Sequence, residues 1–401
     1  MEESKNIELT SADFEEDRYS RLRLIPWWDQ EKLKNACILV VGAGAIGNEL
    51  IKNLALLGIG KILIVDMDKI EQTNLTRSVL FRAGDVGRYK AEVAAERAME
   101  LNPDVRAKAF TSNVIDDIGL GVFARVDAAL GGLDNREARL AINQSCYKLG
   151  KTFIDGAIEA LGGFARVFAP PGPCYECTMT EADWRMINQR KSCALLTHEQ
   201  MAEGKIPTTP TSSSIIAGVQ VQEMLKILHA DRGLPTLAGK GYVFNGLTHD
   251  SFVVEYQKKP DCMSHDAYGP AEKMPWRAEK TTLAEVLQKA RQDLGEGAVV
   301  DFDRDIASLA SCACGQKKPL FAPVHKLRGA DLACPDCGKA MQFETFHTLT
   351  GSEDFLNKTL GEIGIPPLHI FCGRRGMEER YYECTGDEAA VFAGLGQEER
   401  I

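Results

Sequence analysis

The segment that most restricts the fold of this chain is an apolar run that breaks into a glycine-rich turn and then into a helical pattern. Residues 37–41 are Cys-Ile-Leu-Val-Val, and Gly42, Gly44 and Gly47 follow at the spacing Gly-x-Gly-x-x-Gly. Glycines let the backbone turn tightly and approach a phosphate group, whose charge then lies at a helix N-terminus. The segment therefore predicts a strand–turn–helix unit that binds a nucleotide, without identifying the nucleotide.

Apolar strand-like runs alternate with helical patterns from Cys37 to about Phe168. We expect strands at 37–41, 61–65, 106–110, 127–131 and 151–155, separated by helices at about 47–57, 90–101 and 135–149. This alternation is typical of a doubly wound α/β domain, a Rossmann-like parallel or mixed sheet with helices on both faces. A loop rich in proline and cysteine follows at 170–213, then a helix to about His229 and strands near 241–245 and 251–256.

Length and charge limit the possible classes of protein. A chain of 401 residues, 44% of them hydrophobic, is long enough for two domains. We expect a nucleotide-binding domain at 1–265, a linker at 266–280 and a smaller α+β domain at 281–401. The net charge of -10 disfavours a broad surface for nucleic acid or anionic membrane. Because the first twenty residues lack a signal-peptide pattern and no apolar run reaches about 18 residues, we expect a cytoplasmic protein with no nucleic-acid or membrane partner.

Charged and amide side chains after the glycine turn narrow the choice of nucleotide. Asp66 ends the second strand, where a dehydrogenase would bind the ribose of a nicotinamide cofactor. Asn74, Arg77 and Lys90 add donors and positive charge, and Asp134 follows a later strand. Each alone is also typical of an exposed side chain or a helix cap. Adenylation uses the whole set, because cations neutralise the phosphates and the leaving pyrophosphate while a carboxylate holds magnesium. Adenylation is favoured, and a dehydrogenase remains the alternative.

The ordered set of motifs resembles the ThiF/MoeB and ubiquitin-activating-enzyme superfamily over about residues 14–265. The matching segments are Arg18-Tyr19-Ser20-Arg21, the glycine turn with Ala45, Asp66-x-Asp68, Asn74-Leu75-x-Arg77, Lys90, Leu133-Asp134-Asn135, Cys174-x-x-Cys177 and Ala217-Gly218-Val219-Gln220. The resemblance implies ATP-dependent adenylation of the C-terminal glycine of a ubiquitin-like, β-grasp protein. It also implies a homodimer, in which Asp66 contacts the ribose and Arg21 reaches the ATP phosphates of the neighbouring subunit. The family's usual Asn-Leu-Asn-Arg-Gln is Asn-Leu-Thr-Arg-Ser here, at residues 74–78, and keeps the asparagine and the arginine.

One cysteine pair in the central loop finds a partner pair after the last strand of the first domain. Cys174 and Cys177 are two residues apart, and Cys262 and His265 have the same spacing. Two such pairs are the usual source of the four ligands of a tetrahedral zinc ion. We therefore expect a zinc site, with unpaired buried thiols as the alternative. Relatives in the superfamily generally have a second cysteine pair here, so His265 departs from their pattern.

A second quartet lies in the C-terminal region. Its members are Cys312, Cys314, Cys334 and Cys337, and a glycine follows each pair. This spacing is typical of a zinc ribbon. Four thiolates leave no open coordination position, so a structural role is expected, in which the metal stabilises a small domain.

Cys193 stands apart from both quartets, beside Lys191 in the loop that precedes the helix ending near His229. The superfamily tends to carry its acceptor cysteine in this region, where it captures the adenylated carboxylate as a thioester. Nearby cations would lower the pKa of the thiol and so favour the nucleophilic thiolate. The alternative is a buried structural cysteine.

The favoured function is thus that of a magnesium-dependent activating enzyme, which adenylates a ubiquitin-like protein and then forms a thioester. Activation of a sulfur-carrier protein for cofactor synthesis is the nearest alternative. A dehydrogenase is a remote one, and the presence of Arg77, Lys90 and Asp134 disfavours a catalytically silent scaffold. The extra region 281–401 fits recruitment of a further protein, such as a conjugating enzyme.

Overall fold

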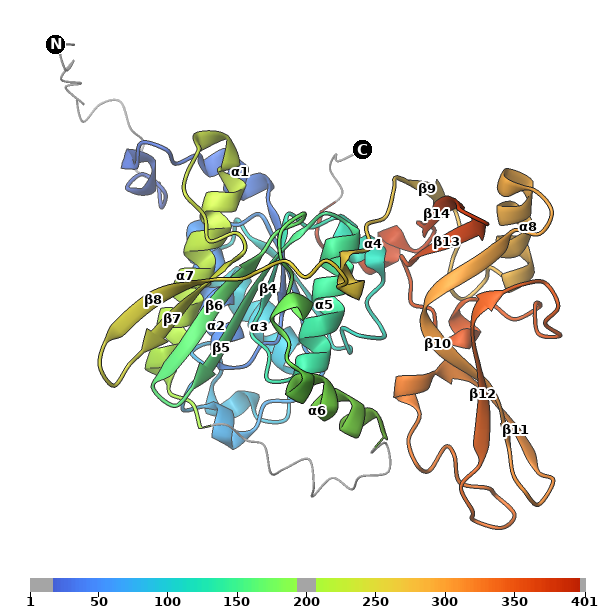
Figure 1. Cartoon of the computed structure of the whole chain (residues 1–401). Coiled ribbons are helices and arrows are strands. Elements are labelled where there is room, and N and C mark those ends of the chain that lie inside the picture. The colour runs from blue at the N-terminus through green and yellow to red at the C-terminus, as the bar shows by residue number, and fades with distance from the viewer. Residues whose placement is uncertain (1–16, 193–206, 397–401) are drawn as a thin grey trace.

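The computed structural model describes residues 17–192 and 207–396, which form two sheets side by side (Figure 1). The first sheet has eight strands in the order β3-β2-β1-β4-β5-β6-β7-β8. Their bounds are β1 Cys37–Val41, β2 Lys61–Val65, β3 Arg106–Phe110, β4 Ala128–Gly131, β5 Thr152–Glu159, β6 Gly162–Phe168, β7 Lys240–Asn245 and β8 Asp250–Glu255. Strands β1 to β5 are parallel and β6 to β8 are antiparallel. The expected doubly wound, mixed α/β sheet is confirmed.

Helices cover both faces of this sheet because its central strands are apolar on both sides. The helices of this half are α1 Gln30–Asn35, α2 Ala45–Leu57, α3 Lys90–Leu101, α4 Leu120–Ala124, α5 Arg136–Lys148, α6 Glu181–Ser192 and α7 Pro210–Leu228. Ile38 and Val40 of β1 share one buried cluster with residues of α2, α3 and α7. Leu39 and Val41 lie in a second cluster with residues of α4 and α5. This alternation follows from the two-residue period of a strand.

The second sheet packs around α8 Leu283–Leu294. Its strands are β9 Ala271–Met274, β10 Val299–Ser311, β11 Lys317–Pro323, β12 Gln342–Leu349, β13 Ile370–Arg375 and β14 Glu378–Cys384. The order is β11-β10-β13-β14-β9, with β12 also paired to β10. Strand β9 pairs parallel with β14, from Ala271 opposite Tyr381 to Met274 opposite Cys384. The stretch 266–280, which the sequence predicts to be a linker, therefore contributes a strand to this sheet.

Contacts between the two halves are extensive. Leu368 and Leu395 are buried in the cluster that α4 and α5 form with the first sheet. The backbone N–H of Gly121 donates to the carbonyl of Leu368 at 2.6 Å, and a Cβ at Gly121 would lie 2.5 Å from that oxygen. The chain thus contacts the first half at Leu368, just before β13, and again at Leu395, after β14.

Within the described residues, no helix combines the length and apolarity required to cross a membrane.

Candidate functional site

The glycine turn lies at the point where the strand order reverses. Strand β1 has β2 on one side and β4 on the other, which is where doubly wound folds bind ligands at the carboxyl ends of the strands. Gly42 has φ +89°, and a Cβ there would lie 2.6 Å from the carbonyl oxygen of Gly132, in the loop after β4. A Cβ at Gly47 would lie 1.8 Å from the Gly42 carbonyl oxygen. These two glycines are therefore required by the close approach of three backbone segments.

Gly44 differs from its neighbours, because it faces open space. Among the described residues, none has an atom within 4 Å of a Cβ built at Gly44. Gly44 is the N-cap of α2, and Ala45 is the first helical residue. The first N–H groups of a helix have no partner within the helix and attract anions. The turn thus offers donors at an open position.

Asp66 and Lys90 bring the end of β2 to this turn. Asp66 accepts hydrogen bonds from the N–H of Ala43 at 2.7 Å and of Asp68 at 2.8 Å. Burial raises the pKa of Asp66, and the charge of Lys90 opposes the rise. Lys90 Nζ lies 2.9 Å from Asp68 Oδ2, and the lysine side chain is 13% exposed. Asp66, which the sequence analysis expects to contact a ribose, is therefore held against the glycine turn by the backbone N–H of Ala43.

Asn74 and Arg77 lie in the loop after β2. The Oδ1 of Asn74 accepts from the N–H of Glu71 at 2.9 Å, which closes a capping box over the turn Gln72–Asn74. Arg77 donates from Nη1 to the carbonyl of Thr73 at 2.8 Å. Asn74 therefore acts as a cap, the simpler of the two roles that its sequence position allows. Its amide nitrogen is a further hydrogen-bond donor.

Asp134 is exposed in the loop between β4 and α5. The next residue, Asn135, caps α5 by accepting from the N–H of Ala138 at 2.7 Å. Arg139, one turn into the helix, donates to the carbonyl of Leu133 at 2.5 Å. Asp134 is thus held between two residues whose positions α5 determines.

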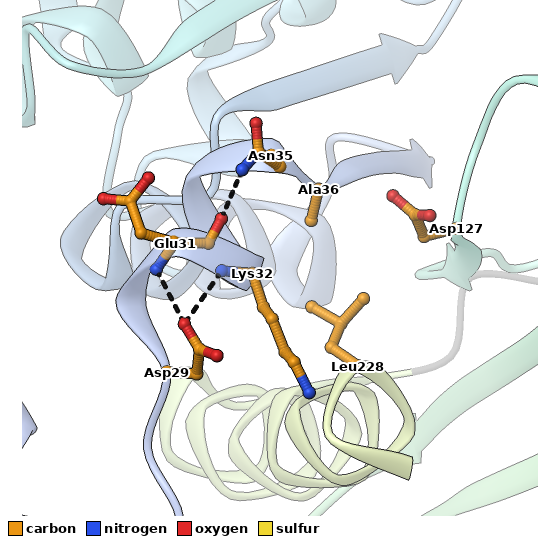
Figure 2. Close-up of a pocket in the computed structure, with 7 residues that line it drawn as sticks. All are labelled: Asp29, Glu31, Lys32, Asn35, Ala36, Asp127 and Leu228. Atoms are coloured by element: carbon orange, nitrogen blue, oxygen red, sulfur yellow. Dashed lines mark hydrogen bonds between the residues drawn. The ribbon is translucent and has the colours of Figure 1, made fainter. Parts of the chain in front are cut away.

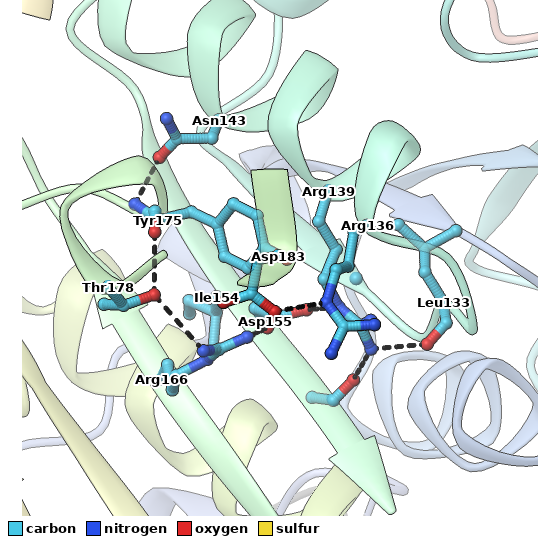
Figure 3. Close-up of polar contacts among 12 residues, drawn as sticks. Leu133, Arg136, Arg139, Asn143, Ile154, Asp155, Arg166, Tyr175, Thr178 and Asp183 are labelled. Atoms are coloured by element: carbon cyan, nitrogen blue, oxygen red, sulfur yellow. Dashed lines mark hydrogen bonds and ion pairs between the residues drawn. The ribbon is translucent and has the colours of Figure 1, made fainter. Parts of the chain in front are cut away.

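Arg139 belongs to a buried ionic network that the sequence reasoning missed (Figure 3). Asp155 of β5 is completely buried, and its Oδ1 lies 2.8 Å from Arg139 Nε. Arg166 of β6 binds the other oxygen, at 2.5 Å, and stacks on Phe164 at 4.3 Å and on Tyr175 at 5.0 Å. The signal in the sequence is a charged residue inside a buried strand, which is rare unless it is paired.

Arg21 lies far from the glycine turn of its own chain. Its neighbour Tyr19 is buried under Gly58, where a Cβ would come within 2.5 Å of the tyrosine hydroxyl. Gly58 caps the C-terminal end of α2, a helix of 13 residues and so about 20 Å long. Arg21 itself is exposed. It is therefore separated from the N-terminus of α2 by the length of that helix.

The structure brings together both predicted quartets. In each, the four ligand atoms lie within 4.8 Å of one another. The Sγ atoms of Cys174 and Cys177 are 3.8 Å apart, and Cys174 lies 3.6 Å from Cys262. The Nε2 of His265 lies 3.2 Å from the Sγ of Cys177. Tetrahedral zinc with bonds of about 2.3 Å to sulfur separates its ligands by about 3.8 Å, so the donor set fits zinc.

The second quartet joins the two turns at the far ends of β10, β11 and β12. Cys312 lies 3.5 Å from Cys337, and Cys314 lies 3.6 Å from Cys334. The N–H of Gly315 donates to the carbonyl oxygen of Cys312 and that of Gly338 to the carbonyl oxygen of Cys334, which closes the two tight turns. The spacing again suits tetrahedral zinc, with no position open for a substrate.

Cys193 lies outside the described residues. The helix α6, which ends at Ser192, leads directly to it. The helix is fixed to α5 by an ion pair in which Arg136 Nε lies 2.7 Å from Asp183 Oδ1 (Figure 3). Cys37 and Cys146 are buried in β1 and α5.

A cavity of about 380 Å³ lies elsewhere on the first half (Figure 2). It is lined by Asp29, Glu31, Lys32, Asn35, Ala36, Asp127 and Leu228. Ala36 and Asp127 directly precede β1 and β4. The cavity is therefore at the amino ends of the parallel strands, opposite the glycine turn.

The family of the chain follows from comparison with known proteins. Residues 16–264, more than half of the chain, match the ThiF family. The chain belongs to the ThiF family. This membership decides against the dehydrogenase interpretation of the glycine turn. The matched residues include the first sheet and the three cysteines of the first quartet. The match ends one residue before His265 and before β9.

Relatives within this family are adenylyltransferases and activating enzymes. The chain is 32% identical over 255 residues to the sulfur carrier protein adenylyltransferase of Thermus thermophilus, covering 61% of this chain and 89% of the relative. It is 30% identical over 274 residues to ubiquitin-like modifier-activating enzyme 5 of Dictyostelium discoideum, covering 63% and 68%. The solved structure of E. coli MccB with ATP is 25% identical, with a TM-score of 0.52, covering 63% of this chain and 75% of that one.

Proposed function

We propose that this chain catalyses the ATP-dependent adenylation of the C-terminal carboxylate of a ubiquitin-like protein. The carboxylate oxygen forms a bond to the α-phosphorus, the bond from that phosphorus to the bridging oxygen breaks, and pyrophosphate leaves. The observation that carries this proposal is the gathering of the glycine turn, Asp66, Lys90 and Asp134 at the switch point of a ThiF-family sheet. Relatives that activate modifiers and relatives that activate sulfur carriers support both kinds of ubiquitin-like substrate equally.

Each side chain has a role in this reaction. Asp66 would accept from the ribose, while the N–H groups at Gly44 and Ala45 would contact phosphate oxygens. Arg77 and Lys90 would neutralise the charge that develops on the phosphates and on pyrophosphate. Magnesium, when bound, would add positive charge at the phosphates, and the exposed carboxylate of Asp134 is the group that would hold it.

The direct test is ATP–pyrophosphate exchange. Purified protein with a carrier that ends in glycine should incorporate labelled pyrophosphate into ATP, and Asp134→Ala should abolish the exchange. Asp354→Ala, which removes an exposed carboxylate from the other half of the protein, is the matched control and should keep the wild-type rate. An unchanged rate of ATP–pyrophosphate exchange in Asp134→Ala would contradict the assignment of Asp134 to the site.

We further propose a homodimer in which Arg21 acts on the ATP of its partner. The separation of Arg21 from the glycine turn of its own chain supports action across subunits. Arg21→Ala and Asp134→Ala should each be inactive alone. When the two variants are co-expressed at equal levels, about a quarter of the wild-type exchange activity should return. The reason is that half of the dimers are mixed and each mixed dimer has one of its two sites intact. Absence of recovery would place Arg21 in its own chain's site, whereas an active Arg21→Ala protein would place Arg21 outside catalysis.

Thioester formation at Cys193 is a second proposed step. The thiolate would attack the acyl carbon of the adenylate, the carbon–oxygen bond to AMP would break, and AMP would leave. Cys193→Ala should keep pyrophosphate exchange and lose a carrier adduct that thiols cleave. A cleavable adduct that persists in this variant would remove Cys193 from the role, and would favour direct use of the adenylate as in sulfur-carrier activation.

We assign zinc to both quartets, as a structural metal, on the strength of their ligand spacing. We also propose that the second half, residues 281–401 with β9, provides a docking surface for a further protein such as a conjugating enzyme.

A further inference from the structure

Asn48 connects the glycine turn to the loop that carries Arg77. It follows Gly47 on α2, and its side chain is completely buried. Its Nδ2 donates to the carbonyl oxygen of Ala43 at 2.7 Å and of Gly44 at 3.0 Å. Its Oδ1 accepts from the backbone N–H of Leu80 at 2.9 Å. Both donors and one acceptor site of this amide are therefore used, and each partner belongs to a loop of the candidate site.

The two carbonyls that Asn48 binds determine the direction of two N–H groups. A peptide unit is planar and trans, so its carbonyl and its N–H point in opposite directions. Holding the Ala43 carbonyl fixes the N–H of Gly44, and holding the Gly44 carbonyl fixes the N–H of Ala45. These are the N–H groups at the open side of the turn, where a Cβ at Gly44 would meet none of the described atoms. Asn48 thus orients the phosphate donors from behind.

The third hydrogen bond of Asn48 reaches the other loop. Leu80 is 3% exposed and packs in the core beside α2, and Ser78 is 4% exposed. Arg77 lies directly before this buried segment, so its backbone position depends on where Ser78 and Leu80 are fixed. The single amide of Asn48 therefore sets the separation between the glycine turn and the Arg77 loop.

We propose that Asn48 is a positioning residue for adenylation, which aligns the glycine turn and Arg77 on the same triphosphate. This inference rests on the proposed function, in which both loops contact ATP. Asn48 itself does not contact the substrate. Its effect is exerted through the N–H groups of Gly44 and Ala45 and through the backbone that carries Arg77.

Two substitutions separate the parts of this role. Asn48→Asp keeps an acceptor for Leu80 and replaces the two donors with an acceptor, whereas Asn48→Ala removes all three bonds. Because misplacement of about 1 Å can cost 100-fold in rate, we expect kcat of ATP–pyrophosphate exchange to fall roughly 10- to 100-fold in both variants. The KM for ATP should change less than about threefold, since Asp66 and its own backbone contacts are untouched.

A second measurement reports on the connection without using catalysis. In amide hydrogen exchange, the Leu80 N–H should stay protected in Asn48→Asp and lose protection in Asn48→Ala. Gln30→Glu is the matched control, because it makes the same amide-to-carboxylate change at a residue that is 9% exposed on α1 and whose Nε2 donates to the carbonyl of Leu57 at 2.9 Å. The control should keep kcat and the protection of Leu80, which shows that a new buried carboxylate is not by itself the cause.

Several results would overturn the assignment. These are kcat within about threefold of wild type in both variants, a rise in KM for ATP with kcat unchanged, or unfolding of both variants by circular dichroism, which would make Asn48 a folding residue. Failure of the proposed function is distinguishable, because wild-type protein would then show no exchange with any carrier. In that case a Leu80 amide equally protected in wild type and Asn48→Ala would still refute the connection.

Discussion

A carboxylate with no exposed surface, Asp155, shows how single residues fix the candidate site. Two guanidinium groups neutralise it, and one of them, Arg139, also holds the carbonyl of Leu133 beside Asp134. A buried charge is costly unless it is paired and hydrogen-bonded. The same arginine therefore contributes to stability and to the placement of a proposed magnesium ligand.

Arg139→Met should reveal this dual role. Asp155 keeps its pair with Arg166, but its Oδ1 loses the buried hydrogen bond from Arg139, so the free energy of unfolding should fall by about 2–3 kcal/mol in urea denaturation. Adding Asp155→Asn should recover none of that loss, because the Arg166 guanidinium, whose side chain is 13% exposed, then loses its carboxylate. A loss below about 1 kcal/mol in the single variant would contradict the importance of this pair.

At the scale of elements, the expected parallel strands of the first half and the helices α2, α3, α5 and α7 form close to their predicted bounds. The sequence does not predict β6, α1, α4 or α6, and α6 lies within the stretch 170–213 that is expected to be a loop. Strands β1, β2 and β3 have the expected bounds, because apolar runs bordered by glycine, proline and charged residues leave little freedom. Strand β5 continues to Glu159, beyond the expected end at 155. It does so because it forms a hairpin with β6, from Phe153 opposite Phe168 to Glu159 opposite Gly162.

Other features could not be derived from the sequence, since they depend on contacts between distant residues. Strand β9 lies in a segment with prolines and charges, and its partner β14 is about 110 residues away. Asn48 and Arg139 have ordinary sequence surroundings, and their partners Leu80 and Asp155 are identified only by distance. In contrast, the two quartets follow from spacing alone, because metal ligands occur in short-spaced pairs.

The second quartet, at the far ends of β10, β11 and β12, gives a prediction for these elements. Metal analysis of the purified protein should find about two zinc ions per chain, one for each quartet. Cys314→Ser should reduce the content to about one and should make the β11–β12 connection sensitive to protease, because the metal stabilises this thin region. Cys372→Ser, outside both quartets, should keep both ions. Equal zinc content in wild type and Cys314→Ser would contradict the assignment.

On the scale of the whole molecule, the two halves behave as one structure. Arg125 of the first half lies 2.5 Å from Glu388 and is also paired with Glu383, which is 5% exposed. Leu368 and Leu395 are buried in the core beneath α4 and α5. The second half is therefore expected to hold a fixed orientation to the site, instead of moving on a linker.

Calorimetry tests this coupling. Wild-type protein should unfold in a single transition, whereas Arg125→Ala should show two, because the buried Glu383 is left without its partner. Lys240→Ala, which removes the exposed pair with Glu255 on the first sheet, should leave the profile unchanged. Two transitions already present in the wild-type protein would mean that the halves are independent.

The open space at Gly44 divides the three glycines of the turn into two kinds. Gly42 and Gly47 leave no room for a methyl group because backbone atoms lie against them, so alanine at either should cost stability. Gly44 has a negative φ of -76°, so alanine there avoids the left-handed strain that it would meet at Gly42, where φ is +89°. Gly44→Ala should therefore melt like the native protein while its methyl group fills the volume intended for phosphate. The turn thus contains one position at which nucleotide recognition is separable from folding. The Gly44→Ala protein should be folded but unable to bind ATP, and so would serve as the negative control in binding experiments on this chain.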